Sequence, residues 1–307
     1  MYNVFIDGSA GTTGLKILDR LSKRKDINLI TLPEELRKDE NARKQALNSA
    51  DVAFLCLPDA AAIQAVSLVE NENVKIIDTS TAHRTNEKWQ YGFAEINGFS
   101  KKIAFSKRIA NPGCHASGFI SLISPLINAG VLDKGAKLTC FSITGYTGGG
   151  KKMIAEYEGQ DKPLLYDAPR QYALSQSHKH LPEMQKYCLL ENLPIFCPIV
   201  ADYDRGMEVS VPLFKSQISC DINELKEIYK NAYNGPVVKF VENSDEGGFL
   251  SANSMKGSDA MEISVHGNED RILLVSRFDN LGKGASGAAI QNMNILLGVD
   301  QTTGLDL

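Results

Sequence analysis

From residue 1 to about residue 110, short apolar runs alternate with stretches of helical periodicity, and no other feature constrains the fold as strongly. Strands are expected at 4–6, 28–32, 52–57 and 75–78, with helices starting near residues 13 and 40 and over 60–70. Strands that alternate with helices are typical of parallel sheets covered on both faces. The runs are nearly all apolar, as strands buried on both faces are. The sequence therefore predicts an α/β, Rossmann-type domain.

From about residue 137 the pattern changes to longer runs in which apolar and polar side chains alternate. Strands are expected at 137–146, 194–203, 206–214, 236–242, 261–267 and 271–279. Few helices separate them, so an α+β domain with a mixed, largely antiparallel sheet is expected. The segment 282–298 has near-helical spacing and is predicted to return to the first domain. The predicted domains are therefore 1–112 with 284–307, and 113–283.

Composition excludes several classes of protein. The chain of 307 residues has a net charge of -4 and no basic tract, which argues against nucleic acid as a partner. A strand is expected from residue 4, and no apolar run reaches the ~20 residues of a membrane span, so a cytoplasmic protein with no membrane partner is expected. The six cysteines are scattered without a C-x-x-C pair, which favours reduced thiols over disulfides or zinc.

A glycine-rich turn, "GSAGTTG", follows the first predicted strand and opens a helix. At such a position the backbone N–H groups and the helix dipole favour a pyrophosphate. The alternative is a turn that needs glycine only for positive φ and close helix packing. We predict a dinucleotide site formed by the glycines and hydroxyls of this turn: Gly8, Ser9, Gly11, Thr12, Thr13 and Gly14.

The residues after the second predicted strand bear on the type of dinucleotide. An acidic residue at the end of that strand usually binds the ribose 2′-hydroxyl of NAD. Here Glu34 and Glu35 lie a residue or two beyond the expected place. Cations that suit a 2′-phosphate, or that form a solvated helix face, follow at Arg37, Lys38, Arg43 and Lys44. NADP(H) is favoured, with Arg37 and Lys38 as contacts.

The segment "IANPGCHASGF" carries the sharpest chemical signal. Pro112 and Gly113 break the chain, so Cys114 is expected in the first turn of a helix that runs to about residue 129. The positive end of the helix dipole favours the thiolate there, which makes Cys114 a candidate nucleophile rather than an inert buried thiol. Backbone N–H groups at the same helix start are expected to hold a substrate oxyanion.

Two of the five histidines, His178 and His180, stand just before Pro182 and Glu183. An imidazole can take a proton from a thiol and return it to a nascent alkoxide when a third group fixes its tautomer. Glu183 is the candidate for that group. A metal site is the alternative, but Glu183 is the one further ligand at helical spacing, so no metal is predicted.

Five motifs together resemble the N-acetyl-gamma-glutamyl-phosphate reductases in their shorter form, within the aspartate-semialdehyde and glyceraldehyde-phosphate dehydrogenase superfamily. The motifs are "GSAGTTGL", "DTSTAHR", "NPGCHASG", "SHKHLPE" and "DNLGKGASGAAIQNMN", in order from residue 8 to 294. The resemblance implies an NADP-binding Rossmann-type domain and a catalytic and dimerisation domain. It also implies Cys114 as the nucleophile and one of the histidine pair as the acid/base. His180 is preferred over His178 because it stands three residues before Glu183.

The implied reaction is NADPH-dependent reduction of N-acetyl-glutamyl 5-phosphate to N-acetyl-glutamate 5-semialdehyde and phosphate, through a cysteine thioester, in arginine biosynthesis. The implied partner is a small-molecule acyl phosphate, and the implied assembly is a homodimer or homotetramer. Arg84 and Ser142 are predicted to contact substrate or phosphate, and Asn280 the nicotinamide amide. Further candidates for a substrate carboxylate are Arg205, Lys151 and Lys152.

The chain departs from the family pattern directly after the nucleophile. An aromatic residue and, two positions on, a threonine are usual there, whereas this chain has His115 and Ser117. His115 can itself tune the thiol, which leaves the identity of the base open. Two alternative functions also stay open: an aspartate-semialdehyde dehydrogenase-like acyl-phosphate reductase, and a non-catalytic NADP-binding sensor.

Overall fold

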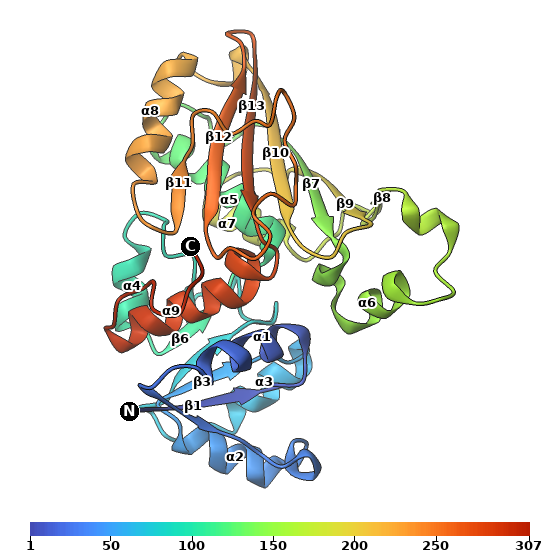
Figure 1. Ribbon diagram of the computed structural model, residues 1–307. Coiled ribbons are helices and arrows are strands. Elements are labelled where there is room, and N and C mark those ends of the chain that lie inside the picture. Colours follow the sequence, from blue (N-terminus) through green and yellow to red (C-terminus); the bar gives the residue numbers. More distant parts are fainter. The chain divides into compact units, whose positions relative to one another are not determined.

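The computed structural model describes residues 1–307, which form two compact units (Figure 1). Unit 1 comprises Met1–Ala94, Gly98–Pro112 and Ala285–Leu305. Unit 2 comprises Glu95–Asn97, Gly113–Gly284 and Asp306–Leu307. The chain therefore passes between the units five times, after residues 94, 97, 112, 284 and 305.

Unit 1 is built on a six-stranded sheet in the order β2-β1-β3-β4-β6-β5, and all its strand pairs are parallel. This confirms the Rossmann-type prediction. The chain leaves β1 toward β2 on one side and continues to β3 on the other, so the order reverses beside the end of β1. The strands are β1 (Tyr2–Asp7), β2 (Ile27–Ile30), β3 (Val52–Leu55), β4 (Lys75–Asp78), β5 (Gln90–Tyr91) and β6 (Arg108–Ala110).

Helices cover both faces of this sheet, because alternate strand residues point to opposite faces. Val4 and Ile6 belong to the core under α1 (Thr12–Leu21), α4 (Phe99–Phe105) and α9 (Gly287–Leu297). Phe5 belongs to the core under α2 (Glu40–Ser49) and α3 (Asp59–Ser67). The predicted C-terminal helix is thus present as α9, and it buries Ala289, Ile290, Met293 and Leu296 in the first of these cores.

Unit 2 holds a seven-stranded sheet in the order β11-β12-β13-β10-β7-β9-β8 (Figure 1). The pairs β7/β9 and β11/β12 are parallel and the other four are antiparallel, which confirms the mixed, largely antiparallel prediction. The strands are β7 (Thr139–Gly145), β8 (Arg170–Gln171), β9 (Ile195–Ala201), β10 (Met207–Phe214), β11 (Val238–Phe240), β12 (Met261–Gly267) and β13 (Arg271–Phe278).

The remaining helical segments of unit 2 connect or cover these strands. They are α5 (Cys114–Asn128), η2 (Tyr146–Gly149), α6 (Gly150–Glu158), η3 (Leu164–Asp167), α7 (Leu181–Cys188), η4 (Lys215–Gln217), α8 (Ile222–Ala232) and the larger part of the π-helical η5 (Gly282–Ser286). In unit 1, η1 (Glu34–Leu36) follows β2. Because α5 packs against β10, β13, α7 and α8, its residues 115–127 are buried on every side.

A proline inside α5 is compensated from outside the helix. Pro125 has no N–H, so the carbonyl of Ser121 one turn earlier loses its helical donor. The Tyr233 hydroxyl donates to that carbonyl at 2.7 Å, and the Tyr229 hydroxyl donates to the Leu122 carbonyl at 2.5 Å. The tyrosines at the end of α8 therefore complete the backbone hydrogen bonding of the helix that begins at Cys114.

We expect Tyr233→Phe to destabilise unit 2, because the Ser121 carbonyl is then buried without a donor. The loss is about 1–3 kcal/mol, seen as a fall of roughly 2–4 °C in Tm per kcal/mol. Tyr2→Phe is the control, since its hydroxyl lies 3.4 Å from the Leu297 carbonyl and should contribute little. Equal Tm values for both variants in thermal unfolding would show that the Tyr233 hydroxyl does not support α5.

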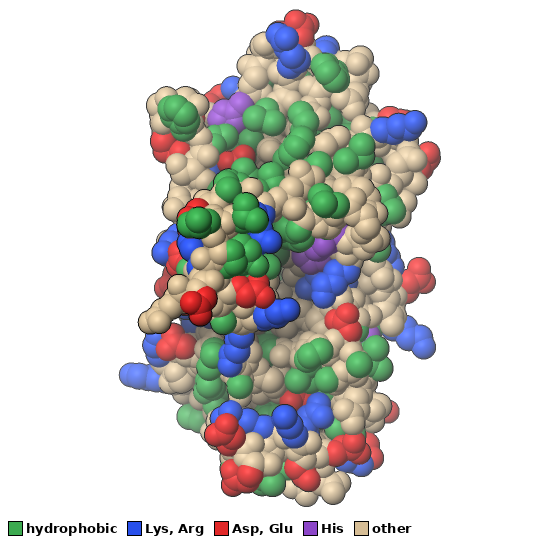
Figure 2. Space-filling model, turned by 90° about the vertical axis from the view of Figure 1, so that its right-hand side faces the viewer, with side chains coloured by type: hydrophobic (Ala, Val, Ile, Leu, Met, Phe, Trp, Pro, Cys, Tyr) green, Lys and Arg blue, Asp and Glu red, His purple; other side chains and the backbone are tan.

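The surface carries charges of both signs. On the face shown in Figure 2, Lys and Arg side chains lie interspersed with Asp and Glu. This face therefore offers no continuous basic stripe of the kind that nucleic-acid backbones require. No helix has both the length and the apolar character needed to cross a membrane.

Candidate active site

The glycine turn lies at the carboxyl end of β1, where the strand order of unit 1 reverses. Gly8 has φ +88°, and a Cβ there would lie 2.3 Å from the Cys56 carbonyl oxygen. A Cβ at Gly14 would lie 2.4 Å from the Gly8 carbonyl oxygen, so these two glycines are required by the turn itself. Ligands of open parallel sheets bind at such a reversal point.

Two observations at the same turn fit a bound dinucleotide. Gly11 has an ordinary φ of -75°, and a Cβ there would meet nothing closer than 3.4 Å, so the protein alone does not require glycine. The Thr12 hydroxyl is buried without a hydrogen-bond partner, and no side chain caps the start of α1. Glycine at a place where only a ligand approaches, beside an unused donor, is what a phosphate cradle requires. Ser9 and Thr13 flank it, half-buried.

The cations after β2 separate into two groups. Arg37 and Lys38 are exposed, as a contact for a 2′-phosphate requires. Arg43 is buried, and its Nη2 lies 2.9 Å from Asp7 Oδ2 at the end of β1. Burial raises the pKa of Asp7, and the Arg43 guanidinium opposes that rise. Lys44 pairs with Glu70 at 2.5 Å, so Arg43 and Lys44 are committed to carboxylates of the protein.

Arg84 lies buried in unit 1, just beyond the end of β4. Its Nε donates to the Asn111 carbonyl at 2.9 Å and its Nη2 to the Thr79 carbonyl at 3.0 Å. The neighbouring His83 bonds Asp78 at 2.6 Å and stacks on Trp89 with ring centroids 4.1 Å apart. The "DTSTAHR" segment is therefore held rigidly, with the guanidinium anchored on backbone carbonyls.

Cys114 is the first residue of α5, as predicted, and it is half-buried. Glu183, which is 1% exposed, accepts a hydrogen bond from the Gly113 N–H at 3.0 Å. The N–H of the N-cap residue is therefore not free, and the prediction that backbone N–H groups hold an oxyanion rests on the N–H groups that follow it. A Cβ at Gly284 would lie 3.0 Å from the Cys114 Cβ, so η5 packs directly against the cysteine.

The histidine pair lies over the start of α5. The ring centroids of His178 and His180 are 4.7 Å apart, and those of His115 lie 5.9 Å from His178 and 5.5 Å from His180. The backbone N–H of His180 donates to His178 Nδ1 at 3.2 Å, and His180 is the N-cap residue of α7. The sequence motif thus brings both imidazoles, with Glu183, to the turn that carries Cys114.

His115 is held by two hydroxyls. Its Nδ1 lies 2.6 Å from the Ser142 Oγ and its Nε2 lies 2.7 Å from the Tyr172 hydroxyl. Burial, and then the charge of His178, lower the pKa of His115 to about 3. Ser142, predicted to contact substrate, is thus bonded to His115. Tyr172 was not predicted, because it lies in an irregular segment after β8 where no motif marks it.

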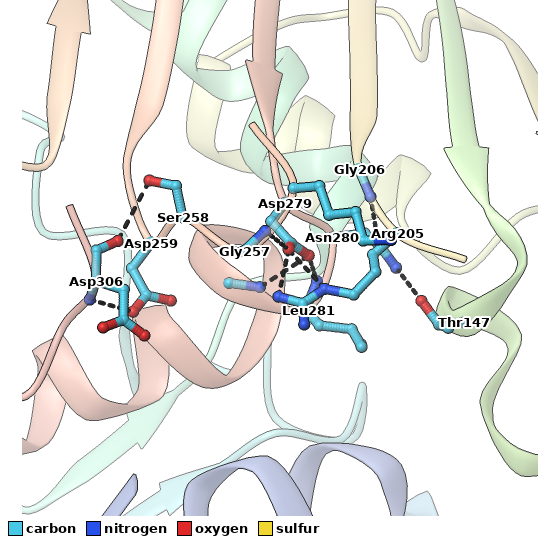
Figure 3. A network of polar contacts seen from close by, with 12 residues as sticks. Thr147, Arg205, Gly206, Gly257, Ser258, Asp259, Asp279, Asn280, Leu281 and Asp306 are labelled. Atoms are coloured by element: carbon cyan, nitrogen blue, oxygen red, sulfur yellow. Dashed lines mark hydrogen bonds and ion pairs between the residues drawn. The ribbon is translucent and has the colours of Figure 1, made fainter. Parts of the chain in front are cut away.

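Asn280 belongs to a polar network of unit 2 (Figure 3). Its Oδ1 accepts from the Gly206 N–H at 2.8 Å and its Nδ2 donates to the Thr147 Oγ1 at 3.1 Å. The side-chain amide of Asn280, the predicted nicotinamide contact, is therefore hydrogen-bonded to Gly206 and Thr147 of its own unit.

The neighbouring Asp279 is fully buried and is the centre of the same network. It accepts from Arg205 Nε at 2.7 Å and Nη2 at 2.5 Å, so Arg205 is tied to this carboxylate. It also accepts from the N–H groups of Gly257 at 2.6 Å and Leu281 at 2.8 Å. Three loops are joined in this way directly before η5, the segment that contacts Cys114.

Two family profiles match the chain in order. The profile described as "Semialdehyde dehydrogenase, NAD binding domain" matches residues 32–104, and "Semialdehyde dehydrogenase, dimerisation domain" matches residues 114–280. The fold is similar to solved structures of aspartate semialdehyde dehydrogenases. One, from Vibrio cholerae in complex with ASA, has a TM-score of 0.72 at 16% identity and covers 97% of this chain and 98% of its own. Another, from Candida albicans with NADP, has a TM-score of 0.66 at 13% identity and covers 97% of this chain and 98% of its own.

Sequence relatives are much more similar. The "N-acetyl-gamma-glutamyl-phosphate reductase 2" of Nostoc sp. is 43% identical over 319 aligned positions, which cover 98% of this chain and 98% of the relative. The "N-acetyl-gamma-glutamyl-phosphate reductase" of Brucella ovis is 44% identical over 305 positions, which cover 96% of this chain and 98% of the relative. Both matches extend over essentially the whole of each chain.

Proposed function

Since the chain belongs to the N-acetyl-gamma-glutamyl-phosphate reductase family, we propose that it reduces N-acetyl-glutamyl 5-phosphate with NADPH to N-acetyl-glutamate 5-semialdehyde and phosphate. The reaction is reversible and belongs to arginine biosynthesis. The observation that carries the proposal is the half-buried Cys114 at the start of α5, between His115, whose ring contacts those of His178 and His180, and Gly113, whose N–H is bonded to Glu183. A nucleophile, an acid/base and an orienting carboxylate are the groups that acyl transfer through a thioester needs.

The first step is acyl transfer to the cysteine. The Cys114 thiolate attacks the acyl carbon of the acyl phosphate, the C–O bond to phosphate breaks, and a thioester forms as phosphate leaves. The helix dipole of α5 favours the thiolate that starts the step. The bond from Gly113 to Glu183 fixes the turn that carries the sulfur.

The second step reduces the thioester. NADPH, when bound, supplies a hydride. A histidine protonates the oxygen of the resulting hemithioacetal and takes the same proton back as the C–S bond breaks, which releases the aldehyde and the Cys114 thiolate. His180 is our first assignment for this acid/base and His178 the second, and the larger loss of kcat between His178→Asn and His180→Asn identifies the group.

The cofactor site is assigned to the glycine turn of unit 1. Phosphates would be bound by the turn from Gly8 to Gly14, with donors from the hydroxyls of Ser9, Thr12 and Thr13. The unpartnered Thr12 hydroxyl and the unstrained Gly11 support this assignment. Arg37 and Lys38 would take the 2′-phosphate. Two contacts remain predictions: that of Arg84 and Ser142 with the substrate, and that of Asn280 with the nicotinamide amide. The contacts of these residues described above are with the protein itself.

We further propose that residues 1–112 and 284–307 form the NADP-binding domain and residues 113–283 the catalytic and dimerisation domain, in a homodimer or homotetramer. The dimerisation profile matched over residues 114–280 supports assembly through the second of these. The six cysteines are free thiols, which agrees with a reducing compartment such as the cytoplasm.

The test is the reverse reaction, followed as NADP⁺ reduction by absorbance with N-acetyl-glutamate semialdehyde and phosphate. We expect turnover that requires phosphate and that prefers the acetylated aldehyde to aspartate semialdehyde. A preference for aspartate semialdehyde would identify an aspartate-semialdehyde dehydrogenase-like reductase. Binding of NADP⁺ without turnover of either aldehyde would favour a non-catalytic sensor and contradict the proposal.

A further inference from the structure

Three side chains of unit 2 form a continuous series of hydrogen bonds through His115, the residue next to the nucleophile. Ser142 Oγ lies 2.6 Å from His115 Nδ1, and His115 Nε2 lies 2.7 Å from the Tyr172 hydroxyl. His115 directly follows Cys114 and is 4% exposed. Both ring nitrogens of His115 are therefore hydrogen-bonded to side chains of the protein. Which of the two carries the proton decides which hydroxyl donates and which accepts.

The imidazole in the middle is neutral. Burial and the charge of His178 hold the pKa of His115 at about 3, so it carries no net charge near pH 7. A neutral imidazole has one N–H donor and one acceptor nitrogen. One of the two hydroxyls must therefore donate to His115, and the other must accept from it.

The burial of Ser142 shows which of the two hydroxyls donates to His115. Ser142 is 0% exposed, and His115 Nδ1 is the one partner of its hydroxyl. A buried hydroxyl proton without an acceptor is costly, so this proton lies on the bond to Nδ1. Nε2 then carries the ring proton and donates to the Tyr172 oxygen. The proton of the Tyr172 hydroxyl is consequently directed away from His115.

Tyr172 lies among the histidines near the start of α5, where its hydroxyl proton can be donated to a substrate. Its ring centroid is 6.0 Å from that of His178 and 6.2 Å from that of His115, in edge contacts. Burial and then the charge of Cys114 raise the pKa of Tyr172, so the hydroxyl stays protonated at neutral pH. The Gly113 N–H, one of the donors expected for an oxyanion, is already bonded to Glu183. A side-chain donor near the sulfur would add to the N–H groups of the first turn of α5.

We propose that Tyr172 is a catalytic residue whose hydroxyl donates a hydrogen bond to the acyl oxygen of the substrate on Cys114, and that His115 and Ser142 are positioning residues that fix its direction. The inference rests on the proposed function, because that function supplies the acyl group. A donor that meets an oxygen where negative charge develops acts mainly on kcat.

Steady-state kinetics of five variants test the direction of these hydrogen bonds. Tyr172→Phe is expected to lower kcat by about 10²-fold, with KM changed by less than about threefold. His115→Phe should lower kcat about tenfold, and His115→Phe with Tyr172→Phe should be no slower than Tyr172→Phe alone. His115→Gln, whose amide reaches the position of Nε2, should recover most of kcat. His115→Asn, whose amide reaches only the position of Nδ1, should not.

Controls separate this inference from folding and from the proposed function. Tyr233→Phe removes another buried hydroxyl bonded to α5 and should keep kcat near wild type. Nitrogen-15 NMR of the histidines should show His115, identified from its loss in His115→Gln, as the neutral tautomer protonated on Nε2. Additive losses in the double variant, or a proton on Nδ1, would overturn the inference even if the wild type is active. An inactive wild type with that tautomer would contradict only the proposed function.

Discussion

Replacing Cys114 with serine is expected to lower kcat by about 10⁴-fold or more, the loss seen when a catalytic nucleophile is removed. A serine hydroxyl at the start of α5 stays protonated near pH 7, whereas the helix dipole favours the thiolate form of a cysteine there. The substitution is nearly isosteric, so NADP⁺ binding and the fold should persist. The measurement is phosphate-dependent NADP⁺ reduction at saturating aldehyde, with thermal unfolding of each variant.

Cys197→Ser is the matched control, because Cys197 is also a half-buried thiol of unit 2 but lies within β9. It should keep kcat within about threefold of wild type, as substitutions away from the reacting atoms do. If Cys114→Ser retained more than a tenth of wild-type kcat, the thioester route would be wrong. The histidines would then have to activate another nucleophile.

Asp279→Ala is expected to give the largest loss of stability. The carboxylate is fully buried and accepts from Arg205 and from the N–H groups of Gly257 and Leu281. Removing one partner of a buried ion pair costs about 3–5 kcal/mol, because the other charge and the N–H groups lose their acceptor. Denaturant unfolding, with the midpoint and slope fitted separately, measures the change.

Asp204→Ala provides the comparison. Asp204 pairs with Lys256 at 2.7 Å, but these side chains are 36% and 50% exposed. An exposed pair contributes less than about 1 kcal/mol, so the control should unfold close to wild type. Similar losses for Asp204→Ala and Asp279→Ala would show that burial does not distinguish them. A drop in kcat of the folded Asp279→Ala protein is also expected, because η5 follows Asp279 and contacts Cys114.

Local patterns in the sequence predict most of the fold. The strand at 75–78 and the helix that begins at Cys114 agree with the structure at these positions, because apolar runs and a Pro-Gly break are local signals. The two-residue strands β5 and β8 were not predicted. Such short strands depend on pairing with distant partners, β6 and β9, rather than on their own residues.

In the site, too, residues that stand in local motifs were predicted, whereas contacts between distant residues were not. Cys114 and the histidine pair stand in motifs whose residue types suit the chemistry, and the structure brings them together. The partner of Glu183 lies 70 positions away and Tyr172 lies 57 positions from His115, so neither contact has a local signature. Arg43 was expected to bind a 2′-phosphate or to lie on a solvated helix face, but it is buried and paired with Asp7 of β1.

The return of α9 to unit 1 has a consequence for biosynthesis. Ala289, Ile290, Met293 and Leu296 close one core of the first sheet, yet they follow residues 113–284 of unit 2 in the sequence. The nascent chain must therefore carry one face of its β1–β4 sheet covered only by α1 and α4 while residues 113–284 are translated. Exposed apolar surface of that kind is what chaperones bind and what drives aggregation. Folding of the nucleotide-binding half is thus completed only after residues 113–284 have been translated.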